Sequence, residues 1–127
     1  MTDPEKRDLI DRYLAAYNAF DVDAMMETVH PDIEFENVAG GEVNASASGA
    51  DAFRQMAEQA TALFSSRQQT VTAFEPDDSG ASVDVDYEGV LASDLPNGMK
   101  AGETLRLAGR SEFEFEDGYI SRLRDIS

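Results

Sequence analysis

Residues 104–126, TLRLAGRSEFEFEDGYISRLRDI, decide the fold class of this chain. From 105 to 115 every second residue is apolar or small, whereas most of the residues between them are charged. This period of two is typical of a β-strand with one buried face. Asp117 and Gly118 then predict a tight hairpin, and the stretch 119–126 predicts a second strand. Two long strands joined by so short a turn indicate an antiparallel sheet.

Further strands and three helices precede this hairpin in the chain. Strands are predicted by alternation, and helices by apolar residues that recur three and four positions apart. The first helix begins at a capping box formed by Thr2 and Glu5, and Asp21 caps the second. The predicted helices extend to residue 20 and over 22–29 and 49–64, and the predicted strands cover 32–38, 69–75 and 82–91, with a short extended piece at 42–48.

The order of these elements predicts an α+β fold. Consecutive strands without intervening helices favour an antiparallel sheet with the helices packed on one face. A strongly bent sheet wrapped around the three helices would form a cone with an interior. The length of 127 residues predicts a single domain over 1–127.

The charge of the chain excludes several classes of partner. It has 26 acidic and 10 basic residues, a formal net charge of −16. Nucleic acids and anionic membrane surfaces require a basic face, so we expect neither as a partner. The N-terminal sequence lacks the pattern of a signal peptide and the chain has no cysteine, so we expect a cytoplasmic location.

The acidic residues also bear on the environment of the protein. Only Lys6 and Lys100 are lysines, and an acid-rich, lysine-poor surface is typical of proteins in concentrated salt. An ordinary acidic mesophilic protein is the alternative. Many of the acids alternate with apolar residues, which predicts that they face solvent: Glu34, Glu36, Asp84, Asp86, Glu88, Glu112, Glu114 and Glu116.

A few polar residues lie on apolar faces, where burial is costly without a partner. A carboxylate in a partly apolar cavity has a raised pKa, which suits a general acid or base near neutral pH. Each residue also has a structural explanation: tying down a loop, relieving crowding, anchoring a helix or pairing with a neighbouring arginine. The residues are Tyr13, Tyr17, Asn37, Ser111 and Asp125.

His30, the single histidine, is predicted to have a structural role. It precedes Pro31 at the predicted end of the second helix, where an imidazolium complements the helix dipole. One histidine without cysteine makes a metal site unexpected. The sequence also has no glycine-rich phosphate loop and no Ser-His-Asp set, so we expect neither a metal nor an organic cofactor.

Three short motifs resemble the SnoaL-like branch of the nuclear transport factor 2-like superfamily. They are residues 12–21, RYLAAYNAFD, then residues 30–32, HPD, before a strand, and residues 117–120, DGYI, with Arg124 and Asp125 after them. The element order also matches, so the resemblance covers essentially the whole chain. It implies the cone-shaped fold, but the superfamily holds isomerases, cyclases, dehydratases, hydrolases and non-catalytic modules.

The resemblance also implies roles for single residues. Asp125 matches the acid/base aspartate of SnoaL-type polyketide cyclases, but their histidine on the preceding strand corresponds to Ser111. In ketosteroid isomerases Tyr13 would match the tyrosine that donates a hydrogen bond to the enolate. Their general base falls at Asn37 and their second aspartic acid at or near Ser111. Because an amide cannot accept a proton from carbon, the ketosteroid isomerase mechanism is not expected.

Two functions follow from these residues. The first is an enzyme in which Tyr13 and Asn37 polarise a carbonyl and Asp125 moves a proton in a small apolar substrate. The second is a non-catalytic ligand-binding or dimerisation module. Tyr17, Asn37, Phe35, Tyr87, Ser111 and Phe113 are the expected ligand-binding residues in either case.

A homodimer through the outer face of the sheet is usual in this superfamily, so the resemblance implies one here. Val90 and Ala92 are candidates for that contact because they are apolar positions on an otherwise acidic strand face.

Overall fold

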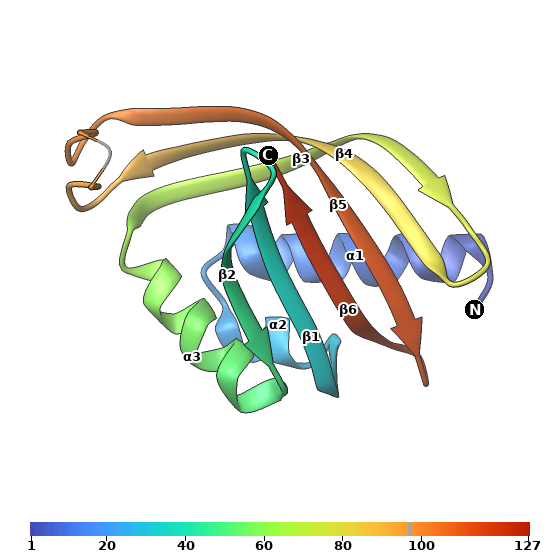
Figure 1. Ribbon diagram of the computed structural model, residues 1–127. Helices are drawn as coiled ribbons and strands as arrows, with labels where there is room; N and C mark the ends of the chain where they lie inside the picture. Colours follow the sequence, from blue (N-terminus) through green and yellow to red (C-terminus); the bar gives the residue numbers. More distant parts are fainter. Residues whose placement is uncertain (97) are drawn as a thin grey trace.

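The structure is a computed structural model that describes residues 1–96 and 98–127. A long helix lies against a curved sheet, and two shorter helices lie near one end of it (Figure 1). The elements in chain order are α1 (Asp3–Asn18), α2 (Val22–Met26), β1 (Val29–Ala39), β2 (Glu42–Ser48), α3 (Ala50–Thr61), β3 (Phe64–Pro76), β4 (Gly80–Leu91), β5 (Thr104–Glu116) and β6 (Tyr119–Ile126).

The six strands form one curved, unclosed sheet in the order β2-β1-β6-β5-β4-β3. Four of the neighbouring pairs are antiparallel, but β1 and β6 run parallel. The prediction of a purely antiparallel sheet was therefore wrong at one pair. The three hairpins after α3 bring the last strand back beside the first, and it arrives in the same direction. Hydrophobic periodicity does not reveal that pairing.

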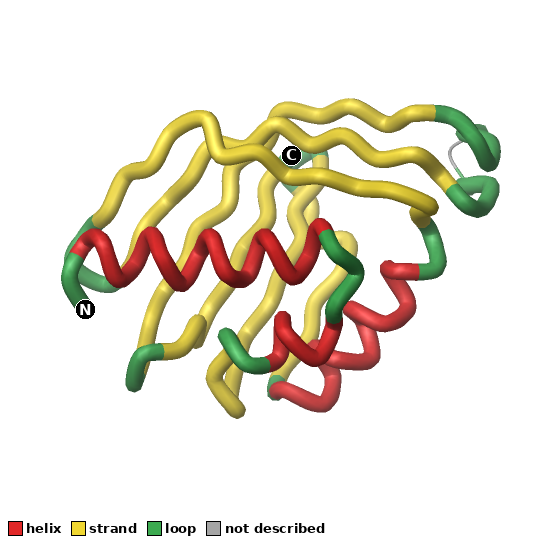
Figure 2. The backbone as a smooth tube through the Cα atoms, turned by 180° about the vertical axis from the view of Figure 1, so that it is seen from behind, coloured by secondary structure: helices red, strands yellow, loops and turns green. Residues whose placement is uncertain are grey.

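The helices lie on the concave face, as predicted for an α+β domain. Figure 2 shows α1 along the inside of the bent strands. The predicted capping box is present: the Glu5 N–H donates to Thr2 Oγ1 at 3.3 Å, and the Thr2 N–H donates to Glu5 Oε1 at 3.0 Å. Ile10, Ile33 and Phe53 are at most 1% exposed in the core between helices and sheet.

All three predicted helices end earlier than expected, and the first ends at Asn18 instead of residue 20. The second ends at Met26 instead of residue 29, because β1 already begins at Val29. His30 therefore lies in a strand, and the predicted role at a helix end is wrong. Its Nδ1 accepts a hydrogen bond from the Asp32 N–H at 3.0 Å. The third helix ends at Thr61, because residues 64–68 pair with β4.

The predicted acidic strand faces point away from the helices and form cross-strand ion pairs. Arg110 bonds Asp84 at 3.1 Å and Glu75 at 3.2 Å. Such exposed pairs contribute at most about 1 kcal/mol each.

No helix in the described ranges is long and apolar enough to cross a membrane.

Candidate functional site

Three polar residues predicted for the site lie side by side in the sheet. Asp125 of β6 is the register partner of Asn37 of β1 on one side and of Ser111 of β5 on the other. All three line a cavity of about 270 Å³ on the concave face. Its other polar lining residues include Tyr17, Gln69 and Tyr87, and its apolar ones are Phe64, Val85, Leu105, Leu107 and Ile126.

Asp125 has the environment of an acid/base group. The Ser111 hydroxyl donates a hydrogen bond to Asp125 Oδ1 at 2.7 Å. Burial raises the pKa of Asp125 to about 6, against a smaller lowering by the Ser111 hydrogen bond. A carboxylate with this pKa is mostly ionised at neutral pH but readily accepts a proton.

Asn37 makes its hydrogen bond to the neighbouring edge strand. Its Nδ2 donates to Asn44 Oδ1 on β2 at 2.7 Å. The structural explanation from the sequence was that Asn37 ties down a loop, but its partner is a side chain of a strand. The side chain still lines the cavity next to Asp125.

Tyr17 and Tyr87 form a second polar cluster in the cavity wall. Their hydroxyl oxygens are 3.0 Å apart and hydrogen-bonded to each other. Tyr17 comes from the last turn of α1 and Tyr87 from the middle of β4, so only the folded chain brings them together. Burial raises the pKa of both hydroxyls, which keeps them protonated at neutral pH.

The other predicted site residues lie in the apolar core and not among the cavity-lining residues. Tyr13 is 4% exposed, and its ring centre is 6.3 Å from that of Phe113 and 6.5 Å from that of Phe53. Phe35 and Phe113 are also buried. The Tyr13 hydroxyl is still affected by the charge of Asp125, which raises its pKa in addition to the larger effect of burial.

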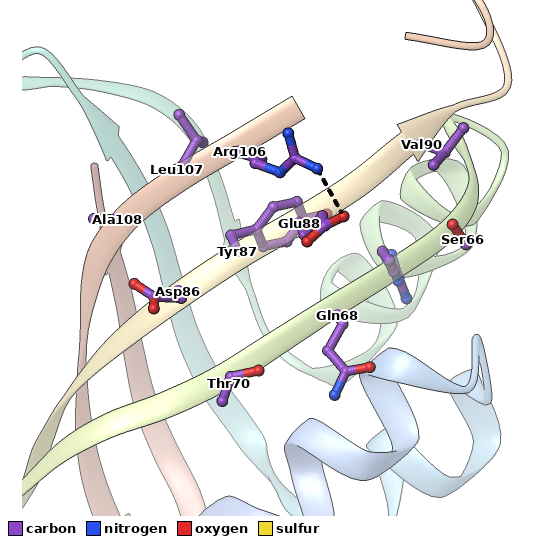
Figure 3. Close-up of a pocket in the computed structure, with 11 residues that line it drawn as sticks. Ser66, Gln68, Thr70, Asp86, Tyr87, Glu88, Val90, Arg106, Leu107 and Ala108 are labelled. Carbon is purple, nitrogen blue, oxygen red and sulfur yellow. Dashed lines mark hydrogen bonds and ion pairs between the residues drawn. The ribbon is translucent and has the colours of Figure 1, made fainter. Parts of the chain in front are cut away.

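The opposite, convex face of the sheet carries a larger depression of about 810 Å³ (Figure 3). Gln68, Glu88 and Arg106 line it from three neighbouring strands, and Glu88 and Arg106 form an ion pair at 3.4 Å. Tyr87 and Leu107 border both the depression and the inner cavity, and strand alternation directs their side chains to the inner cavity. The acidic side chains of this depression are exposed to solvent, whereas the inner cavity holds the buried carboxylate of Asp125, so the inner cavity is the better candidate site.

A potential metal-binding group lies away from the cavity. One ligand atom each of His30, Glu116 and Asp117 lies within 4.8 Å of the others. His30 Nε2 is 3.6 Å from Asp117 Oδ2. Both acids are exposed. Asp117 and Asp125 lie at opposite ends of β6, about 25 Å apart along an extended strand, so this group is not part of the cavity.

A comparison with known protein families shows to which family this chain belongs. The sequence profile of the SnoaL-like domain matches residues 10–123. The chain belongs to the SnoaL-like family. A search of curated proteins yields no match.

Solved structures extend the family relationship to the fold. A candidate polyketide cyclase from Xanthomonas campestris pv. campestris is 21% identical, with a TM-score of 0.84 over 99% of this chain and 93% of that one. TsrD from Streptomyces laurentii is 18% identical, with a TM-score of 0.81 over 98% and 89%. An epoxide hydrolase of M. tuberculosis is 15% identical, with a TM-score of 0.77 over 97% and 82%. At these identities the likeness shows the cone-shaped SnoaL-like fold and not the activity.

Arg67, which is 5% exposed beneath the Tyr17 ring, is a site residue that the sequence pattern did not predict. The prediction began the strand at residue 69, so Arg67 fell outside it. The two-residue period of the strand could have predicted its position, because it places Arg67 on the same strand face as Gln69 and Val71.

Proposed function

We propose that this SnoaL-like protein binds a small, largely apolar carbonyl compound in the inner cavity. Asp125 transfers a proton there, in a reaction of the polyketide cyclase or isomerase type. The observation that supports this proposal is the pKa of Asp125, which burial raises to about 6 inside a ligand-sized cavity. An ionised Asp125 beside apolar walls is a competent base at neutral pH.

The proposed step is proton abstraction next to the carbonyl group. Asp125 takes the proton, the C–H bond breaks, and its electron pair moves to the carbonyl oxygen as an enolate. Protonated Asp125 can return the proton at another carbon, which gives an isomerase. Alternatively, the enolate carbon attacks a second carbonyl of the same molecule, and protonated Asp125 returns its proton to the alkoxide that forms, which gives a cyclase. Neither route needs an oxidant or a reductant.

The size of the cavity limits the substrate. Ligand pockets typically have volumes of about 300–1000 Å³, and this cavity has about 270 Å³. A molecule with one ring fits that volume better than a fused multi-ring polyketide. The apolar residues Leu105, Leu107 and Phe64 favour a substrate with few polar groups.

A non-catalytic ligand-binding module is the second candidate. Ser111 stands where the cyclases have histidine, and Asn37 stands where the isomerases have their base. A protein that had lost its chemistry would keep the cavity and tolerate these replacements. Ser111 still supports the enzyme, however, since its hydroxyl holds the Asp125 carboxylate at 2.7 Å.

Deuterium exchange distinguishes the two functions. Wild type, D125N and the surface control D86N are incubated in D₂O with small monoketones such as cyclohexanone, followed by ¹H NMR. The enzyme proposal expects exchange at the carbon next to the carbonyl to be faster with wild type and D86N than with D125N. Equal rates for all three proteins on every ketone would leave only the binding module.

We further propose that a second copy of the chain covers the outer sheet face. Val90 lines the depression there together with the oppositely charged Glu88 and Arg106, so a copy related by a two-fold axis offers complementary charges. Ala92 lies beyond the end of β4 and does not line the depression. Sedimentation equilibrium should give a dimer that V90D weakens; a monomer at every concentration and salt level would contradict the proposal.

A further inference from the structure

Arg67 is a buried cation, and no acidic side chain in the described part of the chain neutralises its charge. Its Nε donates a hydrogen bond to the Tyr17 carbonyl at 2.9 Å, which satisfies an acceptor at the end of α1. Its Nη1 and Nη2 are buried and have no hydrogen-bond partner among residues 1–96 and 98–127. None of the ion pairs among the described residues includes Arg67. Burying an unpaired charge is costly, so a residue in this state calls for an explanation.

Aromatic rings supply part of that explanation. The guanidinium carbon of Arg67 lies 3.7 Å from the centre of the Tyr17 ring and 4.6 Å from that of Phe20. Cation–π contacts of this kind contribute about 1–2 kcal/mol when they are shielded from water. The rings hold the cation in place but leave its charge uncompensated, and they place that charge directly beneath the ring of a cavity-lining tyrosine.

The tyrosine pair above Arg67 has a hydrogen-bond donor to spare. Each of the two hydroxyls has one proton, and their mutual hydrogen bond uses one of the two. The other proton is available to a ligand, because both Tyr17 and Tyr87 line the cavity. Burial disfavours a negative charge at this pair, and the charge of Arg67 acts in the opposite direction on both hydroxyls.

The polar groups on the other side of the cavity do not offer an equivalent site for an anion. The Ser111 hydroxyl already donates to Asp125. Asn37 Nδ2 donates one N–H to Asn44, and its second N–H lies at the position beside the Asp125 carboxylate. An ionised Asp125 carboxylate would itself repel a negatively charged oxygen. The cavity is therefore polarised, with an acid/base group at β6 and a positive charge under the tyrosine pair.

Building on the proposed function, we infer that the ligands of this cavity are small apolar phenols and enols, bound with their anionic oxygen at the Tyr17–Tyr87 hydroxyl pair above Arg67. In a proton-transfer reaction the same position receives the enolate oxygen. Arg67 is then a positioning residue, which fixes Tyr17 through its backbone and stabilises the anion by its charge without touching the ligand. A charge acting across a water-poor site is much less screened than one in bulk water.

The probe for this inference is 4-nitrophenol, a one-ring phenol whose anion absorbs visible light. Its binding is measured by absorbance as a function of pH at fixed ionic strength. Wild type should bind the phenolate about tenfold more tightly than the phenol, which corresponds to a lowering of the probe's pKa by one unit on binding. R67M and Y87F should each reduce that preference to about twofold or less.

Matched controls keep the result interpretable. R12Q removes an exposed arginine of α1 and Y119F removes an exposed tyrosine hydroxyl, and both should retain the preference of wild type. R67K keeps the charge while losing the planar contact, so it should retain more of the preference than R67M. If R67M does not fold, as judged by circular dichroism, Y87F alone tests the anion site because it leaves Arg67 in place.

Two results would overturn the inference. One is a probe that does not bind to wild type, and the other is a probe whose bound pKa is the same in wild type, R67M and Y87F. Failure of the proposed function looks different. D125N should still bind the phenolate in preference to the phenol, and only its rate of deuterium exchange reports on proton transfer.

Discussion

Replacing Asp125 with asparagine should make the protein more stable at neutral and alkaline pH. Burial raises the pKa of Asp125 to about 6 from an ordinary value of 3.8, so the folded state disfavours the charged carboxylate. The folded protein therefore binds more protons than the unfolded chain between about pH 4 and pH 6. Linkage then requires the contribution of Asp125 to stability to be present below pH 4 and lost as the pH rises through 6.

The size of this effect follows from the same pKa. A shift of about two units corresponds to roughly 3 kcal/mol, at 1.36 kcal/mol per unit. The variant keeps an acceptor for the Ser111 hydroxyl, but the hydrogen bond to a neutral amide is weaker by about 1 kcal/mol. At pH 8, D125N should thus be about 2 kcal/mol more stable than wild type. Near pH 4 the difference should vanish or change sign.

Urea unfolding followed by circular dichroism at pH 4, 6 and 8 measures this difference. The control is D86N, which removes an exposed carboxylate from the convex face and relieves the same overall repulsion. Its effect should stay within about 0.5 kcal/mol and should not follow the titration of Asp125. A D125N protein that is no more stable than wild type at pH 8, or whose advantage is independent of pH, would refute the reasoning.

Three further predictions follow from the geometry. S111A removes the hydrogen bond to the Asp125 carboxylate, so the pKa of Asp125 should rise further, by about one unit. Carboxyl ¹³C NMR measures the pKa of Asp125 in both proteins. An unchanged titration would contradict the hydrogen bond between Ser111 and Asp125. G89A puts a methyl group 2.8 Å from the Phe64 ring. The ring should move into the cavity, so 4-nitrophenol should bind more than about fivefold more weakly. Equal affinity of G89A and wild type would contradict this movement of the Phe64 ring into the cavity. The melting temperature should rise as KCl increases from 0.1 to 1 M, because the Debye length falls from about 10 to 3 Å and the salt screens the repulsion between acidic side chains. A melting temperature that stays constant or falls would exclude adaptation to concentrated salt.

The sequence was sufficient for the elements with strong local signals. Alternation over 105–115 fixed which side chains of β5 face the helices, and the capping box fixed the start of α1. Asp117 and Gly118 both have positive φ values, 55° and 83°, as a two-residue hairpin requires. These features depend on a few neighbouring residues, so periodicity and turn chemistry are enough to read them.

Local signals failed where pairing partners compete. Phe64 continues the apolar stripe of the predicted third helix, but it forms the start of β3 because β4 offers this segment a ladder of hydrogen bonds. His30 was assigned to a helix end for the same reason and lies instead in β1. Tertiary hydrogen bonds outweighed local propensity at both positions.

The candidate site shows the same division between sequence and tertiary structure. The sequence by itself determined that Asn37, Ser111 and Asp125 are polar residues on apolar strand faces, because a period of two assigns each side chain to a face. Only the tertiary structure decided that they are neighbours, since the parallel pairing of β1 with β6 joins segments almost ninety positions apart. It also set Arg67 beneath Tyr17 without an acidic partner. Faces are a local property of the chain, whereas contacts and pKa values depend on what the folded sheet brings together.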